Sequence, residues 1–191
     1  MSEVLLPRKS KIILSTPGVG KTYLGKKYPE QILDMDPMPF LSSNFGEHET
    51  QRDFEKAKST DATNPDFPYN YVDAILKQVN HYDLILITTL LTQACKRQDF
   101  PLDFAEEKLR YQIALPRKSG LDIIFKRLRE RGNNEKFVKD FEKLYPLIIE
   151  RFGNTLGGLT IEDGEYLEDT LLRHKVFTPK KEIASNNLAS N

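Results

Sequence analysis

The chain has 191 residues, and 28 Lys and Arg side chains balance 28 Asp and Glu side chains, so the formal net charge is zero. This length favours one compact domain. The balanced charge argues against a protein that coats a long nucleic acid, because neutralising many phosphates needs an excess of Lys and Arg. A single cysteine excludes a disulfide within the chain and a cysteine-rich zinc site. No apolar run approaches the ~20 residues of a membrane-spanning helix, and no signal-like apolar core is visible, so we expect a cytoplasmic protein without a membrane partner.

Short apolar runs alternate with helix-like segments along the chain. The predicted strands are 11–15, 31–34, 83–88, 111–115 (stopped by Pro116) and 159–161. The third strand is apolar at its centre, which is typical of a strand buried on both faces of a parallel sheet. The predicted helices are 21–28, 49–58, 69–80, 90–97, 118–131, 134–152 and 164–173. This alternation predicts an α/β fold with a mainly parallel sheet, as one domain over residues 1–175 followed by a flexible polar tail over 176–191.

The clearest motif is STPGVGKT, residues 15–22, between the first predicted strand and the first predicted helix. It follows the phosphate-binding pattern G-x-x-x-x-G-K-[ST], with Ser15 in place of the first glycine. The glycines let backbone N–H groups converge on a phosphate, the lysine supplies a full positive charge, and the threonine hydroxyl suits Mg²⁺. A glycine-containing turn with an accidental lysine is the alternative. The motif predicts a site for ATP, with Thr22 as the metal ligand, formed by Ser15, Pro17, Gly18, Val19, Gly20, Lys21, Thr22 and Tyr23.

Carboxylates follow the second predicted strand, at the edge where open parallel sheets bind their ligands. We expect Asp34 and Asp36 to contact the second substrate or, through water, Mg²⁺, although ordinary turn-forming aspartates would give the same pattern. The third strand ends in Thr88, where many phosphate-loop enzymes carry an acidic residue that steadies Mg²⁺. We therefore expect Thr88 to bind substrate or metal-bound water, unless it caps the following helix.

The segment 116–134 is rich in basic side chains beside an apolar stripe with i, i+3, i+4, i+7 spacing that begins at Leu121. Arg127 and Arg131 lie one helical turn apart on one flank of this stripe. Two guanidinium groups in that position can clamp phosphates, and Arg117 is a further candidate for substrate binding. A solvated helix with i,i+4 ion pairs is the alternative interpretation.

Several segments, taken in order, resemble phage-type P-loop nucleotide kinases, similar to nucleoside monophosphate kinases of the adenylate and thymidylate kinase kind. They are STPGVGKT, ILDMD, YDLILITT, YQIALPRKSGLDIIFKRLRERGN and LTIEDGEYLEDTLL, and the resemblance covers roughly residues 10–172. It implies a three-layer α/β/α P-loop domain with about five parallel strands, an acceptor-binding region at about 38–68 and a helical lid at about 116–134. In the implied roles, Gly18, Gly20, Lys21 and Thr22 hold ATP and Mg²⁺, Arg127 and Arg131 are lid arginines, and Asp36 contacts the acceptor.

The expected function is transfer of the γ-phosphate of ATP to a (deoxy)nucleoside monophosphate, with Lys21, Arg127, Arg131 and Asp36 as catalytic residues. A nucleoside kinase or polynucleotide-end kinase with a hydroxyl acceptor is one alternative. A non-catalytic nucleotide-binding regulatory protein is another. The expected partners are small nucleotides, with no long nucleic acid, and a homodimer is left open.

Overall fold

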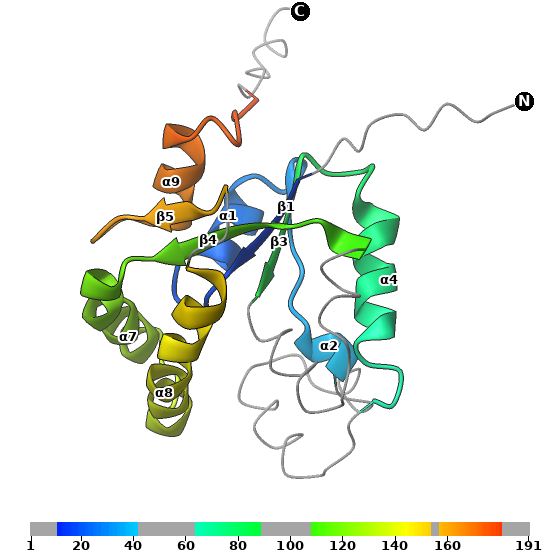
Figure 1. Cartoon of the computed structure of the whole chain (residues 1–191). Helices are drawn as coiled ribbons and strands as arrows, with labels where there is room; N and C mark the ends of the chain where they lie inside the picture. The colour runs from blue at the N-terminus through cyan, green and yellow to red at the C-terminus, as the bar shows by residue number, and fades with distance from the viewer. Residues whose placement is uncertain (1–10, 42–63, 89–107, 154–156, 181–191) are drawn as a thin grey trace, which may run out of the picture.

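The computed structural model describes residues 11–41, 64–88, 108–153 and 157–180 (Figure 1). In this part of the chain, five strands form one sheet in the order β2-β3-β1-β4-β5. The strands are β1 (Lys11–Ser15), β2 (Ile32–Asp34), β3 (Leu84–Thr88), β4 (Gln112–Pro116) and β5 (Leu159–Ile161). The helices are α1 (Lys21–Lys27), α2 (Met38–Leu41), α4 (Tyr69–Gln78), α7 (Leu121–Glu130), α8 (Glu135–Phe152) and α9 (Leu167–Arg173).

All neighbouring strands run parallel, so the prediction of a parallel sheet is confirmed. Every residue of β3 is buried, because helices cover both faces of the sheet. The register pairs Ser15 with Thr88 and Asp34 with Leu86. The carboxyl ends of β1, β2 and β3 therefore meet at one edge of the sheet.

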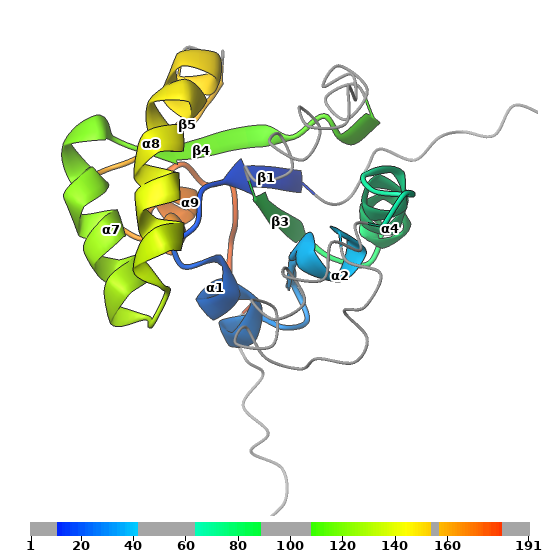
Figure 2. The ribbon, with the colours of Figure 1, turned by 90° about the horizontal axis from the view of Figure 1, so that it is seen from below.

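Helices cover the two faces of the sheet and give a three-layer α/β/α fold. The helix α1 packs on β2, where a Cβ added at Gly25 would lie 3.2 Å from the Cβ of Asp34. An ion pair of 2.8 Å between Lys27 and Glu168 joins α1 to α9. Right-handed connections between parallel strands place α4, α7 and α8 on the other face. Both views show α7 and α8 at one end of the molecule and α4 at the opposite end (Figures 1 and 2). None of the described helices combines the length and apolar character of a membrane crossing.

Several boundaries differ from the sequence prediction, and among them the last helix, expected from residue 164, begins at Leu167. The strand β4 includes Pro116, which pairs in register with Ile161, because the last position of a strand tolerates the missing N–H. The helix expected from residue 118 begins at Leu121, after a 3₁₀ turn over Lys118–Gly120. The domain extends beyond residue 175, since Phe177 is buried in the core. The predicted helices 49–58 and 90–97 and residues 181–191 lie outside the described residues.

Candidate functional site

The turn between β1 and α1 depends on two glycines. Gly18 and Gly20 have φ angles of 81° and 98°, a region that glycine enters at little cost. A Cβ at Gly18 would lie 2.9 Å from Cγ2 of Ile124 on α7, and a Cβ at Gly20 would lie 3.2 Å from Cδ1 of Tyr166. The turn therefore needs glycine for its conformation, and at Gly18 it also needs the absence of a side chain.

Neighbouring elements hold this turn in place. Val19 is fully buried, and its carbonyl accepts a hydrogen bond of 2.9 Å from the N–H of Leu167 at the start of α9. The Ser15 hydroxyl donates to the buried carbonyl of Ala114 on β4, at 2.6 Å. Serine can therefore stand in place of the first glycine of the motif, because its side chain hydrogen-bonds to the neighbouring strand. Of the other predicted cofactor-binding residues, Pro17 is partly exposed and Tyr23 is exposed on α1.

Lys21 is the first residue of α1, and its side chain folds back over the turn. Its Nζ donates a hydrogen bond of 2.7 Å to the carbonyl of Thr16. Burial lowers the pKa of Lys21 to about 8, an effect that Asp34 and Asp36 oppose and that Arg131 increases. The structure thus brings Asp34, Asp36 and Arg131, from two other segments, within electrostatic reach of Lys21.

Hydroxyl and carboxylate oxygens lie at the same edge of the sheet as Lys21. The exposed Thr22 hydroxyl donates to Oδ2 of Asp34 at 2.8 Å. Thr88, at the end of β3, is buried, and its hydroxyl finds no hydrogen-bond partner among the described residues. Within the described ranges, no group of three or more His, Cys, Asp and Glu side chains forms a complete metal site. Hydroxyl and carboxylate oxygens nevertheless fit Mg²⁺, which proteins bind through few side chains together with substrate phosphates and water.

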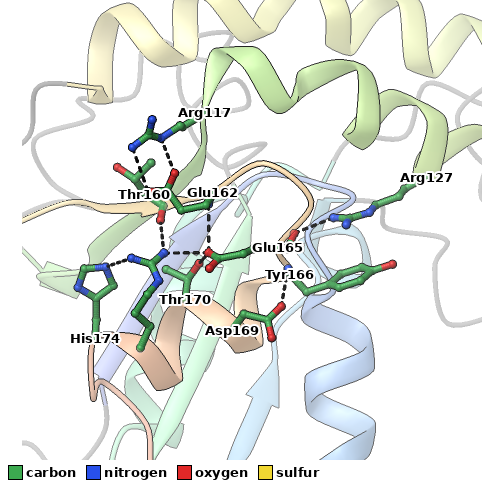
Figure 3. Close-up of polar contacts among 10 residues, drawn as sticks. Arg117, Arg127, Thr160, Glu162, Glu165, Tyr166, Asp169, Thr170 and His174 are labelled. Atoms are coloured by element: carbon green, nitrogen blue, oxygen red, sulfur yellow. Dashed lines mark hydrogen bonds and ion pairs between the residues drawn. The ribbon is translucent and has the colours of Figure 1, made fainter.

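The two predicted lid arginines have different surroundings. Arg127 donates hydrogen bonds of 2.7 Å and 2.9 Å to the carbonyls of Gly164 and Glu165, and its guanidinium lies 3.8 Å from the ring centroid of Tyr166 (Figure 3). It therefore anchors the loop between β5 and α9. Arg131 is exposed, and it lies close enough to Lys21 for its positive charge to lower the pKa of that lysine.

The loop between β5 and α9 is itself rigidly bonded. Oε2 of Glu165 accepts hydrogen bonds from Arg173 at 2.8 Å, from Thr170 at 3.0 Å and from the N–H of Glu162 at 3.1 Å (Figure 3). The hydrogen bond from Arg173 is the main cause that holds the pKa of Glu165 below its usual value. This network positions Tyr166 beside Gly20. Tyr166 was not among the predicted site residues, although it follows the fifth predicted strand, at the edge where open parallel sheets bind their ligands.

Arg117 serves a structural contact in this arrangement. Its Nε lies 2.6 Å from Oε2 of Glu162, and its backbone N–H donates to the carbonyl of Ile161. Figure 3 shows Arg117 and Arg127 on opposite sides of the network around Glu165. Arg117 thus links the ends of β4 and β5, whereas its predicted substrate contact stays a prediction.

No protein-family model and no curated protein matches this chain. The geometry of the site therefore carries the functional proposal.

Proposed function

We propose that the protein is an ATP-dependent phosphotransferase that moves the γ-phosphate of ATP to a (deoxy)nucleoside monophosphate. The observation that carries this proposal is the position of Lys21. Its ammonium group bends over a two-glycine turn at the carboxyl edge of a parallel sheet, with the Thr22 and Asp34 oxygens beside it. A turn of this kind, followed by a lysine and a hydroxyl at the start of a helix, suits a triphosphate.

The residues around the turn between β1 and α1 would each have a separate role in binding ATP and Mg²⁺. The backbone N–H groups of the turn and the ammonium of Lys21 would bind the triphosphate, and Thr22 would hold Mg²⁺. When bound, Mg²⁺ neutralises negative charge on the phosphates. Because the pKa of Lys21 is about 8, most Lys21 side chains carry their charge at pH 7. Arg131, the exposed cation close to Lys21, offsets charge that develops on the transferred group.

An acceptor phosphate needs little chemical activation. It is already ionised at pH 7, so its oxygen can attack without a strong general base. Orientation of the two substrates and electrostatic stabilisation then supply most of the rate. The bonds from Arg127 to Gly164 and Glu165 support this function by fixing the wall of the site beside Gly20.

An assay of ADP formation tests the proposal, with ATP as the donor and a panel of nucleoside monophosphates and nucleosides as acceptors. Replacing Lys21 by Ala should lower kcat about 10²- to 10³-fold, the usual cost of removing one electrostatic contact to the transition state. Lys26→Ala is the matched control, because Lys26 is an exposed lysine on the same helix. Near-normal turnover of Lys21→Ala would contradict the proposed site. ATP binding without product from any acceptor would instead favour the non-catalytic nucleotide-binding protein.

Asp36 supports a second candidate, a kinase with a hydroxyl acceptor. Its exposed carboxylate lies close enough to Lys21 to raise the pKa of that lysine, at the edge where the acceptor would bind. A hydroxyl acceptor needs a base of this kind, and two neighbouring carboxylates disfavour a monophosphate by repulsion.

The variant Asp36→Asn separates the two candidates. With a hydroxyl acceptor, kcat should fall about 10²- to 10⁴-fold because the base is lost. With a monophosphate acceptor, kcat should stay within a few-fold of the wild type or rise. Asp73→Asn, which removes an exposed carboxylate on α4, controls for the change in net charge.

A further inference from the structure

We propose that Asp34, at the end of β2, is the acidic residue of the magnesium site and acts there with Thr22, in place of an acidic residue at the end of β3. The inference rests on the proposed phosphotransferase function and names a residue role within that site. From the sequence alone, Asp34 could contact either the second substrate or Mg²⁺ through water.

The direct evidence is the contact between Asp34 and the phosphate-binding turn. Oδ2 of Asp34 accepts the Thr22 hydroxyl hydrogen at 2.8 Å, although the two residues come from different elements. Asp34 is also the largest electrostatic influence that keeps a proton on Lys21. Asp34 therefore lies at the position where a cation bound by Thr22 would meet its nearest negative charge.

Thr88 supplies an independent observation on the same face of the sheet. Asp34 pairs in register with Leu86, and Thr88 lies two residues further along β3, so both side chains project to the same face. This face is the one that α1 covers, since Gly25 packs against Cβ of Asp34. The Thr88 side chain, 6% exposed, therefore lies on the face of the sheet that α1 covers.

The Thr88 hydroxyl is in an unusual state for a buried polar group. It has no hydrogen-bond partner among the described residues, and an unsatisfied buried hydroxyl costs about 1–3 kcal/mol. A buried polar group of this kind is typical of a place where ordered water or an ion completes the bonding. Mg²⁺ keeps several of its waters in proteins, so a water of its shell would satisfy the hydroxyl.

Charge explains why Asp34 has to supply the carboxylate. Thr88 occupies the end of the strand next to β1 but brings only a neutral hydroxyl. Asp34 lies one strand further out and reaches Thr22 across the start of α1. The site so formed has one carboxylate and two hydroxyls, a set of hard oxygen donors that suits Mg²⁺ with phosphates rather than a transition metal.

The test measures the affinity for ATP by calorimetry, once with excess Mg²⁺ and once with a chelator that removes it. The ratio of the two affinities, called the Mg²⁺ gain below, separates the effect of the metal from ATP binding itself. In Asp34→Asn, which keeps an acceptor for Thr22, the Mg²⁺ gain should fall about 10- to 100-fold, the usual effect of losing a residue that supports a metal. Binding of metal-free ATP should stay equal or tighten, because a carboxylate near Lys21 is removed. Asp36→Asn is the matched control, since it removes an equal charge close to Lys21 and should keep the Mg²⁺ gain.

A double variant distinguishes loss of the carboxylate from a structural change caused by Asp34→Asn. Adding Thr88→Asp to Asp34→Asn returns a carboxylate to the same face and should restore at least part of the Mg²⁺ gain. An undiminished Mg²⁺ gain in Asp34→Asn would overturn the role of Asp34 while leaving the proposed function in place. A wild-type protein that binds no ATP, with or without Mg²⁺, would overturn the proposed function and this inference together.

Discussion

Replacing Gly18 by Ala tests whether the turn between β1 and α1 packs directly against α7. The new methyl would lie 2.9 Å from Ile124 and 3.2 Å from Leu128, in a residue with a φ of 81°. The left-handed backbone conformation costs an alanine about 1–2 kcal/mol. Overpacking against the α7 side chains adds about 1–3 kcal/mol. We therefore expect the free energy of unfolding to fall by about 2–5 kcal/mol, a large part of the ~5–15 kcal/mol of a typical domain.

Gly132 provides a control that separates these two costs. Its φ is 90°, and nothing lies within 4 Å of an added Cβ, so Gly132→Ala should cost only the ~1–2 kcal/mol of backbone strain. Urea unfolding followed by circular dichroism gives both values, provided that the m-values agree. Combining Gly18→Ala with Ile124→Ala should cost at least about 1 kcal/mol less than the sum of the single variants, because the clash is relieved. Equal losses for Gly18→Ala and Gly132→Ala would refute the direct contact between the turn and α7.

Three further outcomes follow from the contacts of the site and its support. The pKa of Lys21 without ligand is about 8, and bound phosphates would raise it, so ATP binding at pH 8–9 should take up a proton and weaken as pH rises. Calorimetry in buffers of different ionisation heat measures this proton uptake. The variant Lys21→Arg should abolish it. Arg127→Ala should lower stability by about 1–2 kcal/mol and speed hydrogen exchange at 164–167, whereas Arg131→Ala should weaken ATP binding and change stability by less than about 0.5 kcal/mol. Tyr145→Phe should destabilise the fold by about 1–3 kcal/mol in urea unfolding, because the buried Pro116 carbonyl loses its 2.7 Å hydrogen bond; an unchanged midpoint would contradict that role.

The local pattern of the sequence predicted most of the fold. Apolar runs such as residues 84–87 have the composition of buried parallel strands, and the structure confirms strands and helices close to their predicted limits. The boundaries that failed depended on distant contacts. Pro116 stays in β4 because β5 pairs with it, and Phe177 belongs to the domain because it packs against Tyr28, with ring centroids 5.1 Å apart.

The sequence by itself also determined the two-glycine turn between β1 and α1, because Gly18, Gly20, Lys21 and Thr22 are neighbours in the chain and glycine readily adopts the positive φ angles found there. Only the tertiary structure decided which distant groups surround that motif. The strand order brings Asp34 to Thr22 and Ser15 to Ala114, contacts that span 12 and 99 positions. The same order places Tyr166 beside Gly20 and engages Arg127 with the loop after β5. Spacing along the chain cannot predict such contacts, since they depend on how parallel strands are ordered and on the register in which they pair.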